Sequence, residues 1–211
     1  MKHLTGFLAF FPFLVLPLYA ADLSDLTYTT TGGEVAITDC NTEASGALTI
    51  PDTIEGSPVT SIADYAFAQC TSLTAVTIPE GVTSIGNFGF FRCIEMHTIT
   101  IPETVIGIGS SAFASCSSLA AITIPDGITS IAGFTFYNCS SLTSITIPDS
   151  VTSIGVGAFS DCSNLRSITI GDSVTSIDGF AFARCSNLKI IMIPDSVTRI
   201  GSDAFIRCTS L

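Results

Sequence analysis

The chain has 211 residues, of which 47% are hydrophobic and only 12% charged, and this composition excludes a disordered protein. Eighteen acidic residues against seven basic ones give a formal net charge of −11. The acidic excess is concentrated between residues 21 and 161, where fourteen acidic residues accompany a single base, Arg92. Nucleic-acid binding needs a basic stripe, so the charge excludes that class for most of the chain.

Residues 1–20 have the pattern of a secretory signal peptide. Lys2 gives a basic start, an apolar run covers residues 4–18, and Ala20 supplies a small residue before the expected cleavage site. The alternative is a membrane anchor, but two prolines interrupt a run already shorter than the roughly 20 residues that span a bilayer. We therefore expect cleavage after Ala20, a net charge of −12 once Lys2 is lost, and no transmembrane segment in the mature chain. The expected location is secreted or at the cell surface.

Beyond the leader, a period of 23 residues organises the chain. Each unit, counted from its cysteine as position 1, carries apolar residues at positions 4, 7, 9, 13 and 16 and a phenylalanine at position 21. Such a period is typical of a solenoid, because one unit cannot bury its own apolar side whereas stacked units can. We expect a lead-in or cap over residues 21–47, a degenerate unit over 48–69, six full units over 70–207 and a truncated unit over 208–211.

Within a unit, the alternation of positions 7 to 9 predicts a β-strand whose residues 7 and 9 point inward. Proline at position 10, replaced only by Gly171, ends this strand because it lacks an amide donor. The following "VTSI" motif predicts a second short extended segment, and "AF" at positions 20 and 21 predicts a turn or a single helical turn. The fold class is therefore a solenoid of mainly parallel β-strands with short helical turns.

The unit "LTSITIPDSVTSIGVGAFSDC", residues 142–162, resembles the BspA-like leucine-rich repeats of bacterial surface antigens. The resemblance covers residues 48–211, and the preceding "LTYTTTGGEVAITDC" is similar to the strand-forming lead-in of such arrays. It implies an exported leucine-rich-repeat solenoid whose relatives act as adhesins or interaction scaffolds. It implies no catalytic residues.

Cysteine marks position 1 of the units, and Cys40 alone lies outside the period. We predict buried free thiols, because stacking in parallel keeps Cβ atoms near the rung spacing whereas disulfides prefer about 3.8 Å between them. Some disulfide formation is one alternative. A metal site is another, although a straight row of thiols does not converge as a tetrahedron. The cysteines of the row are Cys70, Cys93, Cys116, Cys139, Cys162, Cys185 and Cys208.

Position 11 is always acidic. A carboxylate after proline favours a tight corner, and this turn role is the simpler interpretation. The alternative is a column of calcium sites, because Ca²⁺ binds carboxylate and carbonyl oxygens. The candidate cation column comprises Glu80, Glu103, Asp126, Asp149, Asp172 and Asp195, and Asp52 precedes it.

Position 19 carries an aromatic residue in about every second unit. Alternating large and small residues can serve packing between units. If the rings are exposed, they form a binding stripe, because exposed aromatic residues are typical of interaction hot spots. The candidate stripe consists of Tyr65, Phe88, Phe134 and Phe180.

Nothing in the sequence indicates an enzyme or a cofactor. His97 is the only histidine beyond the leader, and motifs such as "GxSxG" and "HExxH" do not occur. We predict an exported, non-enzymatic repeat protein that presents a protein- or surface-binding face, with adhesion or macromolecular interaction as its role. The alternative is a structural cell-envelope spacer module of a longer protein. The last unit lacks a polar cap, so we also expect a fragment of a longer array and end-to-end self-association through the C-terminal rung.

Overall fold

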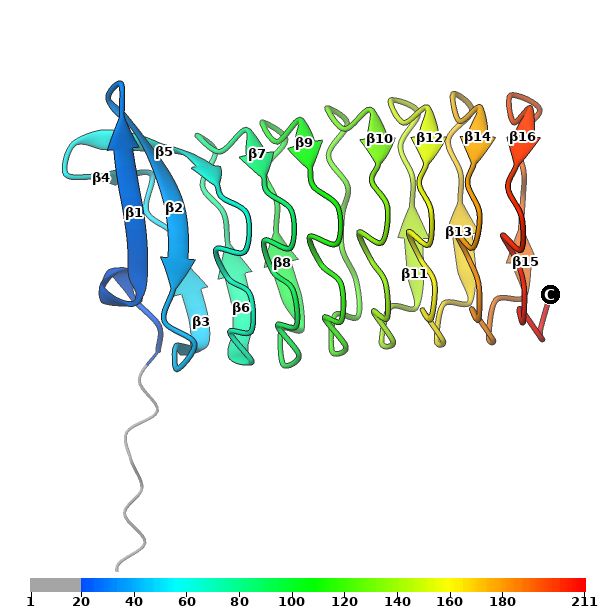
Figure 1. The fold of residues 1–211 in the computed structure, drawn as a ribbon, viewed down its shortest axis with the longest axis horizontal. Helices are drawn as coiled ribbons and strands as arrows, with labels where there is room; N and C mark the ends of the chain where they lie inside the picture. Colours follow the sequence, from blue (N-terminus) through cyan, green and yellow to red (C-terminus); the bar gives the residue numbers. More distant parts are fainter. Residues whose placement is uncertain (1–19) are drawn as a thin grey trace, which may run out of the picture.

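The structure is a computed structural model that describes residues 20–211, and the predicted leader lies outside the described residues except for Ala20. The chain forms an elongated stack in which each 23-residue unit makes one rung, and the rungs follow one another from the N-terminal strands to the C-terminus (Figure 1). The predicted leucine-rich-repeat solenoid with mainly parallel strands is confirmed. The only helix in the described part of the chain is one 3-10 turn, η1 (Leu23–Asp25).

An antiparallel hairpin opens the stack. Strands β1 (Leu26–Thr31) and β2 (Glu34–Cys40) pair with each other, and β2 then pairs in parallel with β5 (Ser57–Ile62) of the first rung. Val35 and Ile37 of β2 are fully buried, so this hairpin covers the apolar interior at the N-terminal end of the rod.

The extra residues of the degenerate unit form a second, smaller hairpin. Strand β4 (Thr53–Ile54) pairs antiparallel with β5 through a two-residue turn. Both turn residues are left-handed, with φ of 51° at Glu55 and 82° at Gly56, which is the requirement of a type I′ turn. The insertion therefore lies at the surface and leaves the rung spacing intact.

One side of the rod carries the strands of positions 6 to 8. The central side chain points inward and its neighbours point outward, as Ile145 and Thr146 illustrate, because successive residues of a strand face opposite sides. All pairs are parallel, and from β6 onward they are in register with the 23-residue period, whereas the β3–β6 pair has a register shift between Gly46 and Ala47. The strands are β3 (Ser45–Thr49), β6 (Ser72–Thr77), β8 (Thr98–Thr100), β11 (Ser144–Thr146), β13 (Ser167–Thr169) and β15 (Ile190–Ile191).

A second side carries two-residue strands at positions 15 and 16. Their isoleucines are buried except for Ile200 of the last rung, which is exposed. Threonines at position 14 connect the rungs through their hydroxyls: Thr152 Oγ1 donates to the Thr129 carbonyl at 3.1 Å, and Thr175 repeats the bond to Thr152. The strands are β7 (Ser84–Ile85), β9 (Gly107–Ile108), β10 (Ser130–Ile131), β12 (Ser153–Ile154), β14 (Ser176–Ile177) and β16 (Arg199–Ile200).

The third side, which we call the corner, is built from consecutive turns over positions 17 to 23. Backbone amides at positions 19, 21 and 23 donate to carbonyls of the next rung, as Phe90 donates to Ala112 at 2.7 Å. The amides all point toward the C-terminal end, and this corner ladder runs unbroken from Tyr65 to the Ile206 carbonyl. Each corner is therefore held both by its neighbours and by hydrogen bonds of its own between residues three apart, such as that from the Phe91 amide to the Phe88 carbonyl at 3.0 Å.

Behind the corner, the phenylalanines of position 21 form a continuous internal column. Adjacent rings lie 4.8–5.6 Å apart with planes within 14° of parallel. The predicted inward orientation is thus confirmed for the six rings that are 0% exposed, Phe67, Phe90, Phe113, Phe136, Phe159 and Phe182.

The two strand sides are interrupted at the rung of residues 116–138. Residues 121–123 of this rung form no strand, so the ladder that ends with β8 is separated from the one that begins with β11. On the second side, β9 pairs with β7 but not with β10. Ile106 and Gly107 stand there in place of the usual threonine and serine. The corner ladder crosses this rung without a gap.

Candidate functional site

The corner places position 19 in a backbone conformation that aromatic residues rarely adopt. Tyr65, Phe88, Phe134 and Phe180 have φ of 55–62°, in the left-handed region. Gly157 holds φ of 60° at the same position of its rung, and glycine enters this region without the steric cost of a Cβ atom. The fold therefore requires the left-handed turn, but it does not require the aromatic side chain.

The aromatic side chains of this stripe remain largely accessible. Tyr65, Phe134 and Phe180 are 55%, 44% and 46% exposed. The ring of Phe134 leans over Gly157, where a Cβ atom would lie 2.5 Å from the ring. The alternation of large and small residues thus serves packing between units, and it leaves nearly half of the Phe134 side chain in solvent. Position 19 therefore fits both the packing interpretation and the binding interpretation.

A cleft of about 360 Å³ lies on the corner between the rungs of Phe134 and Phe180. Phe134 and Tyr137 meet edge to face, with centroids 6.1 Å apart, and form its aromatic wall on the N-terminal side. Phe180 and two arginines, Arg184 and Arg207, line the C-terminal side. The cleft therefore combines exposed aromatic surface with guanidinium groups, which suits a partner with an apolar group next to an acidic or hydrogen-bonding one.

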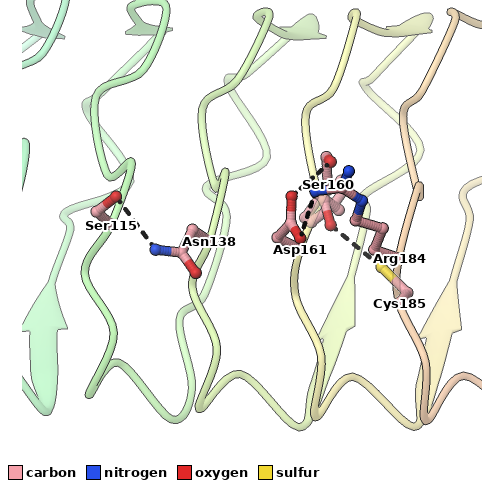
Figure 2. Close-up of polar contacts among 7 residues, drawn as sticks. Ser115, Asn138, Ser160, Asp161, Arg184 and Cys185 are labelled. Atoms are coloured by element: carbon pink, nitrogen blue, oxygen red, sulfur yellow. Dashed lines mark hydrogen bonds and ion pairs between the residues drawn. The ribbon is translucent and has the colours of Figure 1, made fainter.

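Position 23 supplies the polar part of the cleft. Asp161 and Arg184 of successive rungs form an ion pair at 3.5 Å, and the Ser160 hydroxyl donates to the Asp161 carboxylate at 3.2 Å (Figure 2). One rung earlier in the same row, the Asn138 amide donates to the Ser115 hydroxyl at 3.4 Å (Figure 2). The Arg184 side chain stays 56% exposed, so the ion pair leaves much of its guanidinium free to bind a partner.

At the N-terminal end of the stripe the aromatic residues pack on each other. Tyr65 and Phe88 stack with centroids 4.8 Å apart, and Phe91 meets Phe88 edge to face at 5.6 Å. The Arg92 guanidinium lies 5.3 Å from the Phe91 centroid. The same pairing of aromatic residues with arginine therefore occurs twice along the corner.

The sequence prediction missed Tyr137, Asp161, Arg184 and Arg207. Two regularities could have revealed them. Position 22 is aromatic only at Phe91 and Tyr137, each in a unit that is also aromatic at position 19, and position 23 carries three of the six bases beyond the leader. The sequence prediction considered position 19 alone, so it did not connect this position with positions 22 and 23.

The predicted cation column forms a row of exposed carboxylates, one in each rung. Glu103 accepts a hydrogen bond from the Asp126 amide at 3.2 Å, and Asp149 accepts one from the Asp172 amide at 2.9 Å. Both bonds join a carboxylate to the backbone of the next rung. No cluster of three or more potential metal-binding side chains occurs among residues 20–211, and the calcium alternative stays an untested prediction.

The cysteine row lies inside the rod as free thiols, fully buried except for the half-buried Cys208. Each thiol from Cys93 onward donates to the carbonyl of the phenylalanine in the preceding rung at 3.0–3.2 Å. Burial raises the pKa of Cys139 and of Cys185 to about 12, because a thiolate cannot be solvated there. The row is therefore a packing feature, and the raised pKa makes Cys139 and Cys185 poor nucleophiles.

The repeat pattern described as the BspA type leucine-rich repeat region matches residues 40–141 and 129–211, in six copies. The chain belongs to this family. Its members form a repeat scaffold of bacterial surface proteins. No curated protein matched the chain.

Solved structures of bacterial leucine-rich-repeat proteins share this fold. A leucine-rich repeat protein of T. pallidum is 32% identical, with a TM-score of 0.85 over 92% of this chain and 91% of the other. A leucine-rich cell surface protein of Faecalibacterium prausnitzii is 36% identical, with a TM-score of 0.78 over 89% of this chain and 52% of the other. A leucine-rich repeat protein of Bacteroides ovatus is 28% identical, with a TM-score of 0.62 over 84% of this chain and 54% of the other.

The chain thus spans nearly the whole T. pallidum protein but about half of the other two. Among residues 20–211, no helix is long and apolar enough to cross a membrane.

Proposed function

We propose that this chain is an exported, non-enzymatic repeat protein that binds a protein or another cell-surface macromolecule through the corner cleft. The observation that supports this most directly is the left-handed backbone of Phe134 and Phe180, whose rings stay nearly half exposed. Gly157 holds the same left-handed backbone without a ring, so the corner turn itself does not need an aromatic residue, and Phe134 and Phe180 adopt this conformation at a steric cost that glycine avoids. Strained residues of this kind cluster at functional sites, and aromatic residues beside arginine are typical hot spots.

The proposed location is secreted or at the cell surface. The predicted leader supports export, and the F. prausnitzii relative is described as a cell surface protein. Adhesion is the proposed class of activity, because the family is an interaction scaffold and the cleft requires no cofactor to bind a macromolecule. The partner is a protein or a surface polymer rather than a nucleic acid.

Removal of the two rings tests this proposal. Phe134→Ala and Phe180→Ala should each weaken binding about tenfold or more, as hot-spot truncations do. The measurement is binding of the purified chain to immobilised extracellular-matrix proteins and to intact bacterial cells, over a concentration series up to micromolar protein.

The matched control is Thr146→Ala, which removes an exposed outward side chain from β11, away from the corner. It should bind as the unchanged protein does, and all three variants should keep the far-UV circular dichroism spectrum. Equal binding by the phenylalanine variants and the control would exclude the cleft. A protein that binds none of these surfaces would instead support the spacer function.

A further inference from the structure

The first cysteine of the row differs from all those that follow. From Cys93 onward, each thiol donates at 3.0–3.2 Å to a phenylalanine carbonyl of the preceding rung. Cys70 has the N-terminal hairpin before it instead of a complete rung. Its Sγ lies 3.7 Å from the Cys40 carbonyl oxygen and 3.8 Å from that of Asn41, which are long contacts for a thiol donor.

Asn41 takes the place that a phenylalanine has in the later rungs. Its carbonyl accepts the amide of Ala44 three residues on, just as the Phe67 carbonyl accepts the amide of Cys70. The Sγ of Cys40 lies 3.7 Å from the same Asn41 oxygen. Two thiols therefore converge on one carbonyl oxygen, and this pair joins the hairpin to the first rung.

Cys40 is the one cysteine outside the 23-residue period, and it reaches the row from the end of β2. The argument against disulfides within the row, that parallel side chains hold Cβ atoms one rung apart, therefore does not apply to it. Both side chains are buried, at 2% and 0% exposure, so a bond between them would be protected from reductants in the folded protein.

We propose that Cys40 and Cys70 form a disulfide that ties the N-terminal hairpin to the repeat array. The thiols react during folding in an oxidising compartment, before the hairpin closes over them. One of the two, as its thiolate, attacks a disulfide of the glutathione class and releases one reduced thiol. The other then loses its proton and attacks the mixed disulfide, which releases the second thiol and leaves two protein thiols oxidised for one disulfide reduced.

In the folded protein the two thiols are close enough to act on each other. A hydrogen bond between the side chains lowers the pKa of Cys70 and, together with burial, raises the pKa of Cys40.

The test is to refold the mature chain, residues 21–211, with oxidised glutathione, denature it in acid and alkylate the remaining thiols. We expect six of the eight cysteines to be alkylated and cleavage at acidic residues to yield one linked peptide pair containing Cys40 and Cys70. Cys40→Ser should abolish this linked pair and leave seven alkylated cysteines. The matched control Cys93→Ser, which alters an ordinary member of the row, should retain the linked pair with five alkylated cysteines.

A second measurement is the midpoint of urea unfolding with and without dithiothreitol. Reduction should lower the midpoint of the unchanged protein and leave that of Cys40→Ser where it was. Eight alkylated cysteines after oxidative refolding would overturn the proposal, as would links between other pairs at similar yield.

Discussion

At the scale of single residues, the phenylalanine column contains the largest of the fully buried side chains. Phe159 is 0% exposed and lies between two parallel rings with centroids at 5.3 and 5.4 Å. Phe159→Ala should lower the free energy of unfolding by about 3 to 5 kcal/mol, because it leaves a cavity that the stacked rungs cannot close. Urea unfolding followed by circular dichroism measures the loss. Phe205, only partly buried, is the comparison and should lose less; a loss below about 1 kcal/mol at Phe159 would contradict its assignment to the core.

The buried thiols predict a loss of stability at alkaline pH. Burial raises the pKa of Cys139 from 9.0 to about 12, so the folded state holds this proton over a pH range in which the unfolded state has released it. The contribution of this thiol to the free energy of unfolding is fully present below pH 9. It falls as the pH rises toward 12, with a slope of up to about 1.4 kcal/mol per pH unit. Urea midpoints between pH 7 and 10.5 test this sign. Cys139→Ala should show a shallower fall, and an unchanged slope would contradict the expectation.

The residue identities predicted the interior well and the corner poorly. Inward isoleucines, the phenylalanine column and the buried cysteines follow from periodicity, because apolar side chains at fixed spacing must share one interior. The left-handed conformation of Phe134 and Arg184 could not be predicted in this way. Neither residue type signals a positive φ, so only the packing of neighbouring rungs defines it.

At the scale of elements, the strands could be predicted from the sequence and the corner ladder could not. The strand at positions 6 to 8 has a local signature, the alternation that ends at proline, and it forms close to the predicted positions 7 to 9 in each full unit except that of residues 116–138. The corner ladder has none, because its hydrogen bonds exist only between residues about 22 positions apart, such as Phe90 and Ala112. The corner ladder brings the cleft residues together. The sequence therefore predicted the aromatic residues of position 19 but not the cleft residues at positions 22 and 23.

The interrupted rung predicts a local difference in hydrogen exchange. The Ile147 amide donates to the Thr169 carbonyl at 2.9 Å, whereas Ile124 at the same position of its unit has no backbone acceptor within residues 20–211. The Ile124 amide should therefore exchange about tenfold faster or more, because its opening requires no broken hydrogen bond. Exchange measured by NMR on the labelled protein provides the comparison. Equal protection at the two isoleucines would show that the ladder is continuous in solution.

At the scale of the whole molecule, the basic residues and the proposed binding surface both lie toward the C-terminal end of the rod. Most acidic residues belong to the earlier rungs, and five of the six bases beyond the leader follow residue 161. The corner cleft with Arg184 and Arg207 lies in this later part, so an acidic partner meets a favourable potential there and repulsion elsewhere. End-to-end association of the rods stays a prediction.

The gap in both strand sides at residues 116–138 also has a mechanical consequence. Between residues 93–115 and 116–138, both strand sides lack backbone–backbone hydrogen bonds between rungs while the corner keeps them, so bending is easiest about the corner. The corner ladder then acts as a hinge: its length is fixed while the N-terminal and C-terminal halves of the rod tilt relative to each other. Phe134 and Phe180 both follow the gap on the second strand side, so the cleft swings with the C-terminal half. A rod held by its N-terminal end could thus present its binding surface over a range of angles without unfolding a single rung.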